Sequence, residues 1–397
     1  MDLVERPEVA ELSRRIAEFV AREVVPLEAT GGMPPPEAIR RAQDRAKQLG
    51  LWAPQLPRDL GGGDIGLQDL CGVFEAAGRS LLGPLCLGCS APDEGNAHLL
   101  LLAGTPAQKQ KYLEPLARGD IRSAFAMTEP APGAGSDPSM MLTRARRNGD
   151  GWIIDGRKWF STGAAGAAVT IVAAVTDDGR EGRRSRITLF LVDAGSQGFS
   201  VLREIPVLGD TTPGGHCEIA LENCRVGPEQ VLGAPHEGYR LIQARLGPAR
   251  LTHCMRWLGV AARSLEIATA RARERHAFGK LLAEHQAVEW MLADSATEIH
   301  AARLMVRDAA AKVARGERAR VETSMCKVFV AEAVQRVIDR AIQVCGALGV
   351  STELPLARFY QEARAFRIYD GPSEVHRKVI ADDVLGLRRE RGSGAST

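Results

Sequence analysis

The spacing of apolar residues changes twice along this chain, and that change limits the possible folds more than any other feature. Over residues 1–122 apolar residues recur every three or four positions, as Val9, Leu12 and Ile16 do in "VAELSRRIAEF". This period is typical of amphipathic helices. A second helix is predicted in "PPPEAIRRAQDRAKQLG", where Pro precedes the helix and Gly50 follows it.

Between residues 123 and 234 the period becomes two, which indicates strands. In "GWIIDGRKWFST" we expect two short strands joined by a hairpin turn at Asp155-Gly156. "RITLFLVD" and "HCEIALENCRV" also alternate, and Pro and Gly separate these runs at short intervals. The middle section is therefore predicted to be a small β-barrel or sandwich.

From residue 235 to 388 the helical period returns in long segments. In "AVEWMLADSATEIHAARLMV" a stripe of small and apolar residues runs through Val288, Leu292, Ile299 and Val306. A stripe of this length predicts a four-helix bundle that could also supply an oligomer interface. The predicted fold is α+β, with an N-terminal helical domain, a middle β domain, a C-terminal bundle and a disordered tail at 389–397.

The composition excludes several classes of function. The 397 residues include 51 basic and 49 acidic side chains, a balance that argues against a nucleic-acid-binding protein. The charged N-terminus has no signal-peptide core, and no run of residues resembles a membrane span, so a cytoplasmic location is expected. Cys86 and Cys89 form the one CxxC pair. A redox or metal role is open for this pair, but buried thiols are favoured, and no metal is expected.

The segment "AFAMTEPAPGAGSD" (124–137) combines hydroxyl side chains with glycines. Thr128 and Ser136 carry hydroxyls, while Gly133 and Gly135 would let backbone N–H groups approach a ligand. Such a loop could hold a pyrophosphate, or it could be an interdomain linker.

The segment "KWFSTG" places two aromatic residues in succession on a strand. Successive side chains of a strand point to opposite faces, so either Trp159 or Phe160 should be exposed unless it covers a ligand ring. Thr162 should share a face with Phe160. The pattern suits a flat heteroaromatic cofactor, and ordinary core packing explains it equally well.

Five segments together, in this order and spacing, resemble the acyl-CoA dehydrogenase family. They are "MTEP…GAGSD", "GRKWFSTGA", "RHAFGKLLAEHQAV", "AIQVCGALGV" and "RIYDGPSEVHR". The resemblance covers residues 8–387. Three further segments, "SAPDEGNAHLL", "ARLGPARLTHCMRWLGVA" and "DGPSEVH", are most similar to the subgroup that contains the mammalian family members ten and eleven.

The resemblance implies an FAD flavoprotein that oxidises the α–β bond of an acyl-CoA. The residues that it places around FAD, some across a subunit interface, are Phe125, Met127, Thr128, Gly135, Ser136, Phe160, Ser161, Thr162, Arg275, Phe278, Gln286, Gln343, Gly346, Pro372 and Glu374. Those that it places at the substrate are Ser136, Gly247, Arg250 and Gly371. It also implies a homo-oligomer and an electron-transfer flavoprotein as partner.

Asp370 occupies the position of the catalytic base, where most of the family has Glu. This base would remove the proton next to the thioester carbonyl while the β-hydrogen leaves as hydride to the flavin. Burial beside an apolar acyl chain would raise the pKa of Asp370. Alternatively, Asp370 could cap the following helix, with Pro372 near its first position.

Other residues of these motifs are weaker candidates for the base. His376 is expected to be an exposed helix residue, Tyr369 could pack on the flavin or in the core, and Glu129 is an alternative base. Two differences from the family pattern also stand out. The loop "TEPAPGAGSD" is two residues longer than the usual "TEPGAGSD", and Ala347 replaces a commoner Gly.

Three functions are compatible with the resemblance. The first is a dehydrogenase that forms the 2,3-enoyl-CoA. The second is a flavin oxidase that uses O₂ as acceptor and acts on an acyl-CoA or on a nitroalkane. Nitroalkane oxidases resemble this family and also use an Asp base, but Ser136 and Arg250, which match CoA-binding positions, argue against a nitroalkane substrate. The third is a catalytically silent scaffold, which the retained motifs and carboxylate argue against.

Overall fold

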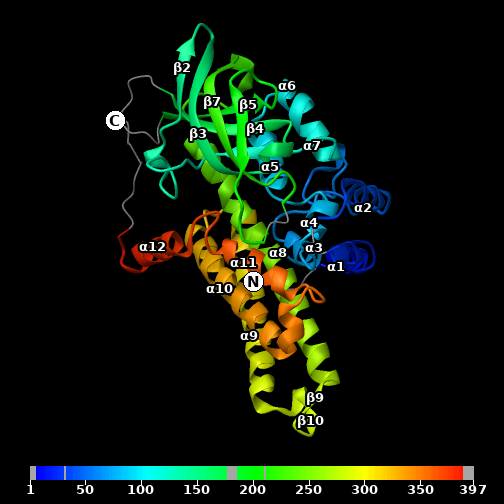
Figure 1. Ribbon diagram of the computed structural model, residues 1–397. Coiled ribbons are helices and arrows are strands. Elements are labelled where there is room, and N and C mark those ends of the chain that lie inside the picture. The colour runs from blue at the N-terminus through cyan, green and yellow to red at the C-terminus, as the bar shows by residue number, and fades with distance from the viewer. Residues whose placement is uncertain (1–5, 31–32, 177–185, 210–211, 388–397) are drawn as a thin grey trace.

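The computed structural model describes residues 6–30, 33–176, 186–209 and 212–387, and Figure 1 shows their arrangement. The sheet lies at one end of the molecule, the long helices extend away from it, and the N-terminal helices lie along one side of both. The predicted tail at 389–397 lies outside the described residues.

The N-terminal part is helical, as predicted. Val9 and Ile16 are buried on the first helix, and Gly50 follows the second in a left-handed conformation (φ +66°). The helices are α1 (Pro7–Phe19), α2 (Pro36–Gln48), α3 (Leu70–Ala77), α4 (Gly83–Cys86), α5 (Asp93–Ala103), α6 (Pro106–Gln108) and α7 (Glu114–Arg118).

The middle part forms one sheet with the order β6-β7-β3-β2-β4-β5-β8, and β1 pairs in parallel with β4. The sheet curls around its own core, because Trp152 of β3 meets Phe190 of β5 edge to face at 5.9 Å although these strands are not neighbours. The strands are β1 (Ser123–Ala126), β2 (Arg144–Asn148), β3 (Gly151–Thr162), β4 (Val169–Thr176), β5 (Ile187–Asp193), β6 (Phe199–Glu204), β7 (His216–Val226) and β8 (Val231–Leu232).

The predicted hairpin turn at Asp155-Gly156 is wrong, because β3 runs through it without a break. The turn lies earlier, between β2 and β3, where Asn148 pairs with Gly151. At Asp155 the side chain accepts a hydrogen bond from the Asn223 backbone N–H (2.7 Å). A Cβ on Gly156 would lie 2.4 Å from the Thr143 hydroxyl. This Asp-Gly pair therefore lies at a register shift in the pairing of β3 with β7, and the chain does not reverse there.

The C-terminal part consists of long antiparallel helices, as predicted. On α9, Ile299 and Val306 of the expected stripe are buried, and Val288 and Leu292 pack partly buried against the same core. The elements are α8 (Gly238–Glu274), β9 (His276–Ala277), β10 (Lys280–Leu281), α9 (Gln286–Ala314), α10 (Arg320–Cys345), α11 (Leu356–Phe366) and α12 (Ser373–Val384).

Helix α8 links the two halves of the molecule. Its first turns contribute Leu246 to a core shared with β4 and α5, and its middle contributes Met255 to the core of the bundle, which also includes Phe74 of α3. In Figure 1, α8 runs from beside the sheet down the length of the bundle. Side chains from the first half of α8 therefore lie where sheet, N-terminal helices and bundle meet.

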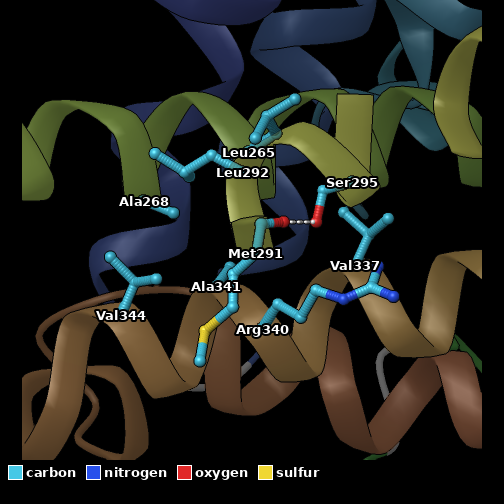
Figure 2. Close-up of a pocket in the computed structure, with 9 residues that line it drawn as sticks. All are labelled: Leu265, Ala268, Met291, Leu292, Ser295, Val337, Arg340, Ala341 and Val344. Carbon is cyan, nitrogen blue, oxygen red and sulfur yellow. Dashed lines mark hydrogen bonds between the residues drawn. The ribbon is translucent and has the colours of Figure 1, made fainter. Parts of the chain in front are cut away.

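The gap shown in Figure 2 lies between α8, α9 and α10, away from this junction. Its lining is mostly apolar and includes Leu265, Leu292 and Val344, and the Ser295 hydroxyl donates to the Met291 carbonyl (2.7 Å). The gap is too narrow for a water molecule, so we interpret it as a packing defect of the bundle and not as a ligand site.

The described residues can be searched for membrane-spanning helices, metal-binding clusters and reactive cysteines. None of the helices described has the length and apolarity needed to cross a bilayer. Among the same residues, no group of three or more His, Cys, Asp or Glu side chains is arranged to bind a metal. All eight cysteines are buried, and burial raises the pKa of both Cys86 and Cys89 to about 12. Such thiols are poor nucleophiles, which favours the structural interpretation of this pair.

Candidate active site

Asp370 lies in the tight turn between α11 and α12, in a left-handed backbone conformation (φ +56°) that is unusual for any residue but Gly. Its carbonyl oxygen lies 2.9 Å from Arg250 Nε of α8, which donates to it, and 3.2 Å from His376 Nε2 of α12. Gly371 is also left-handed (φ +97°), and a Cβ there would lie 2.8 Å from His376 Nε2. Side chains from two helices thus hold this strained turn.

Lys327 of α10 contacts the backbone of the same turn. Its buried ammonium donates to the Phe366 carbonyl (2.6 Å) and lies 4.3 Å from the centre of the Phe366 ring. A longer contact of 3.5 Å reaches the Gly371 carbonyl. Burial lowers the pKa of Lys327 to about 8. Helix α10 therefore contributes to the position of Asp370 through the backbone on both sides of it.

The Asp370 carboxylate faces α8, where His253 Nε2 lies 3.1 Å from Oδ2. Burial acts to raise the pKa of Asp370. Hydrogen bonding to His253, the electrostatic interaction with that ring and the charges of Arg245 and Arg250 outweigh burial and hold the pKa well below its usual range. The raised pKa expected beside an apolar acyl chain stays a prediction, whereas the protein's own groups lower the pKa. The reason is that the carboxylate faces cationic and hydrogen-bonding groups and not an apolar wall.

The alternative role of Asp370 as a helix cap and the expectation of an exposed His376 are both wrong. Asp370 does not cap α12: the N-cap residue is Pro372, and no side chain caps that end. His376 is buried and not exposed, because its Nδ1 contacts the Ser324 hydroxyl of α10 (3.1 Å) while its Nε2 contacts Asp370. Tyr369 packs against the His253 ring at 5.1 Å, and its hydroxyl accepts a hydrogen bond from Trp257 Nε1 (2.7 Å).

The loop after β1 and the end of β3 are joined into one unit. Thr128 Oγ1 donates to the Trp159 carbonyl (2.7 Å), and the Trp159 backbone N–H donates to the Thr128 carbonyl (3.0 Å). On the neighbouring residues of the same two segments, the buried Lys158 ammonium lies 2.8 Å from Glu129 Oε1 and 3.0 Å from the Met127 carbonyl. Glu129 also accepts from the backbone of Leu142. These contacts give Glu129 a structural role and argue against it as the base.

At the end of β3 the regular alternation of side chains breaks. Phe160 has φ +49° and is 46% exposed, so it is the exposed member of the aromatic pair. The two rings nevertheless touch, with centres 5.0 Å apart, so the expectation of opposite faces is wrong. The left-handed residue turns the strand at this point, and the Thr162 hydroxyl contacts His216 Nδ1 (2.9 Å).

Next to Phe160, the Ser161 hydroxyl is buried and has no hydrogen-bond partner among the described residues. Other buried side-chain atoms of the described residues, Thr143 Oγ1 and Ser373 Oγ among them, also lack a partner, so the Ser161 hydroxyl does not by itself mark a ligand contact. The exposed Phe160 ring offers an aromatic surface that a flat ring system such as a flavin could cover. The residues present therefore fit the cofactor that the resemblance implies.

The glycines of the first loop have different roles. A Cβ on Gly133 would lie 2.4 Å from Glu129 Oε2, so Gly133 serves the close approach of that side chain. A Cβ on Gly135 would meet nothing within 4 Å, and Gly135 and Ser136 are exposed. Within the described chain, Gly135 and Ser136 are thus free to meet a ligand.

Arg245 of α8 connects the two parts of the site. Its guanidinium lies 4.3 Å from the centre of the Phe125 ring of β1, and its Nε donates to Asn96 of α5 (3.0 Å). The charge of Asp370 acts on the same guanidinium. Four residues of this region, Arg245, His253, Lys158 and Lys327, were not predicted from the sequence. For α8 the missed signal is the recurrence of polar residues every three to five positions in "ARLGPARLTHCMRW", at Arg245, Arg250, His253 and Arg256.

Five expected cofactor residues lie elsewhere on the surface. The β9–β10 hairpin, which carries Phe278, stands at the end of the bundle opposite the sheet (Figure 1), and Phe278 is 97% exposed. The other four, Arg275, Gln286, Gln343 and Gly346, are exposed as well. Within one subunit they do not join Asp370, and their contact with a neighbour's cofactor stays a prediction. Pro372 and Glu374 lie at the start of α12, and Gly247 lies on α8 near Arg250.

Comparisons with known proteins agree with this arrangement. Three family models, describing the N-terminal, middle and C-terminal domains of acyl-CoA dehydrogenases, match residues 6–120, 124–224 and 236–385. The chain belongs to the acyl-CoA dehydrogenase family. The expected fold, with helical, β and helical parts in this order, is thereby confirmed, as is the expectation of an oxidoreductase of this family.

Individual relatives cover nearly the whole chain. The Mycobacterium tuberculosis protein FadE2, described as a probable acyl-CoA dehydrogenase, is 40% identical over 91% of this chain and 89% of its own length. Mouse acyl-CoA dehydrogenase family member 11 is 37% identical over 93% of this chain, which spans 47% of that protein. Member 10 of the same organism also matches, at 36% identity, which confirms the expected subgroup. The solved glutaryl-CoA complex of glutaryl-CoA dehydrogenase superposes with a TM-score of 0.88 at 30% identity, covering 98% of each chain.

Proposed function

We propose that this chain is an FAD-dependent acyl-CoA dehydrogenase that forms a 2,3-enoyl-CoA, with Asp370 as the base. The observation that carries the proposal is the turn at Asp370. A strained residue is held through its own carbonyl by Arg250 and His376, while its carboxylate faces His253 on α8. Strain maintained by this many contacts is typical of a functional position.

The reaction requires one proton and one hydride to leave the substrate. Asp370 takes the α-proton: the Cα–H bond breaks, an O–H bond forms on the carboxyl group, and the electron pair left on Cα becomes the new double bond as the β-hydrogen departs with its own pair. FAD, when bound, supplies the acceptor for that hydride. Because the free carboxylate has a lowered pKa, the bound thioester must make its α-hydrogen more acidic for the transfer to proceed.

We assign the cofactor to the two joined segments that carry Phe125, Met127, Thr128, Phe160 and Ser161. The exposed Phe160 ring and the hydrogen bonds that join Thr128 to Trp159 support this assignment. One of the solved structures that this chain resembles is an FAD complex of PigA, at 26% identity and a TM-score of 0.85. Thr162, Gly135 and Ser136 would extend the same face toward the pyrophosphate, and Arg250, Gly247 and Gly371 would border the substrate.

The partners follow from the same proposal. Electrons would pass to an electron-transfer flavoprotein, and one structural neighbour comes from a study of such a flavoprotein from Acidaminococcus fermentans. A homo-oligomer would bring Arg275, Phe278, Gln286, Gln343 and Gly346 to a neighbour's FAD. A cytoplasmic location and a role in fatty acid β-oxidation complete the proposal.

Anaerobic spectroscopy tests the proposal. Purified protein is expected to be yellow and to bleach when a saturated acyl-CoA is added, and a panel of chain lengths and branched or hydroxylated acyl groups would identify the substrate. Rapid return of colour in air would replace the dehydrogenase by an oxidase. Bleaching by a nitroalkane and by no thioester would favour a nitroalkane oxidase, and protein without flavin would indicate a silent scaffold.

A further inference from the structure

The Asp370 carboxylate has one side-chain neighbour whose role the reaction above does not explain. His253 lies near the middle of α8 and brings Nε2 to 3.1 Å from Asp370 Oδ2. The imidazole is itself fixed, because its ring packs against Tyr369 at 5.1 Å and Phe366 at 6.2 Å. Both side chains are largely buried, at 16% and 19% exposed, so bulk water does not replace the contact.

The other contacts of the turn hold its backbone and not its carboxylate. Arg250 and His376 meet the Asp370 carbonyl, and Lys327 meets the carbonyls of Phe366 and Gly371. A carboxylate on a short side chain can still rotate about its own bonds when the backbone is fixed. Among the described residues, the Asp370 carboxylate has one side-chain partner for an ion pair or hydrogen bond, which is His253.

The protonation state of His253 suits a neutral donor. Burial and then the charge of Arg256 lower its pKa, and the opposing influence of Asp370 does not restore it. A lowered pKa favours the neutral imidazole, and the neutral tautomer with its proton on Nε2 can donate to Oδ2. A neutral donor orients a carboxylate without removing its charge, and it leaves the second oxygen, Oδ1, for an incoming proton.

The charged and titratable groups around the pair come from several elements. They are Arg245, Arg250, Cys254 and Arg256 on α8, Glu94 on α5, Lys327 on α10, Tyr369 beside Asp370, and His376 on α12.

We propose that His253 is a positioning residue for the Asp370 base, holding Oδ2 by its Nε2–H so that Oδ1 points to the substrate α-carbon. Because Asp370 as base is part of the proposed function, this role rests on that function. The role of His253 explains how a carboxylate one methylene shorter than the usual Glu is kept in a defined orientation: the helix facing the turn supplies a donor for it.

The test compares the FAD-loaded wild type with His253→Leu, which removes the donor, and His253→Gln, whose amide nitrogen can take the place of Nε2. Infrared titration follows protonation of the Asp370 carboxylate, assigned by the band that Asp370→Asn loses. In parallel, anaerobic stopped-flow experiments measure flavin reduction by the best acyl-CoA against pH.

In His253→Leu we expect protonation of Asp370 at a pH about one to two units higher than in the wild type, because a hydrogen bond to a charged group is lost. The acid limb of the reduction rate should move by the same amount, and its plateau should fall by roughly tenfold or more as the carboxylate loses its orientation. The His253→Gln variant should restore most of the wild-type protonation pH of Asp370 and most of the plateau rate of flavin reduction. If the His253→Leu variant loses FAD, the His253→Asn variant is tested instead, because its amide is too short to reach Oδ2. The same shift in the pH at which Asp370 is protonated is expected for it.

The two proposals fail in different ways. An unchanged Asp370 titration in the Leu or Asn variant overturns the role of His253, whatever the activity. A wild type that no acyl-CoA reduces overturns the dehydrogenase function, while the infrared titration still shows whether His253 holds the carboxylate.

Discussion

Lys158 of β3 and Glu129 of the loop after β1 form a buried ion pair, with Nζ 2.8 Å from Oε1 and both side chains almost fully excluded from solvent. Burial lowers the pKa of Lys158 to about 8. Burial acts to raise the pKa of Glu129, but the adjacent Lys158 ammonium outweighs it, and the pKa is lowered. The pair ties together the two segments that carry Thr128 and Phe160.

Removing one member of this pair should be costly. Lys158→Met leaves the Glu129 carboxylate buried without its cation, so we expect about 3–5 kcal/mol less free energy of unfolding and weaker FAD retention. Chemical denaturation and the ratio of flavin to protein measure the two effects. The double variant Lys158→Met/Glu129→Gln should recover a large part of the stability. A loss below ~1 kcal/mol in the single variant would show that the pair does not hold the loop.

Asp370 should tolerate neither removal of its charge nor a longer side chain. Asp370→Asn should keep its FAD but slow anaerobic flavin reduction by about 100- to 10,000-fold, the usual contribution of a general base. Asp370→Glu moves the carboxylate by about 1 Å and away from His253, and should lose roughly 100-fold. Stopped-flow reduction at matched flavin content gives both values. Wild-type rates in the Asn variant would remove Asp370 from the mechanism.

His376 should make the protein less stable in acid. Burial, followed by the charge of Arg250, lowers its pKa from 6.5 to about 4. Between these two pH values the unfolded chain binds more protons than the folded chain, so the free energy of unfolding falls as the pH falls, by up to about 3 kcal/mol. Denaturant titrations from pH 7 to pH 4 measure it.

His376→Gln is the matched control, because it keeps a donor for the Asp370 carbonyl but does not titrate. Its stability should fall less steeply over the same interval. Parallel curves for the two proteins would contradict the buried, neutral state of His376.

The two glycines of the first loop should respond differently to an added methyl group. Gly133→Ala would place a Cβ 2.4 Å from Glu129 Oε2 and should lower the unfolding temperature and disturb the ion pair with Lys158. Gly135→Ala has open space and should leave the unfolding temperature of the FAD-free protein unchanged. A calorimetric scan of both variants checks this. If Gly135 borders FAD as proposed, its Ala variant should weaken FAD binding alone.

Several features could be predicted from the sequence, because they depend on local chemistry. Apolar periods of three to four and of two identified the helical and β parts, and the buried stripe on α9 follows from its spacing alone. The order of five motifs identified the family, and Asp370 was recognised by its place within the last of them. One of two adjacent aromatics, Phe160, is exposed as expected, although the left-handed backbone at this residue and not regular strand alternation sets its position.

The surroundings of Asp370 were decided by the tertiary structure, because they come from residues far apart in the chain. Its carboxylate meets His253, 117 positions earlier, and its turn is held by Arg250 and Lys327 from two other helices. From the sequence, a helix cap stayed open as an alternative role for Asp370, His376 was expected to be exposed, and the pKa of Asp370 was expected to rise beside an apolar acyl chain. These expectations considered neighbours along the chain and an apolar pocket. The sign of a pKa shift depends on which charges are close in space, and that is fixed only when the helices pack.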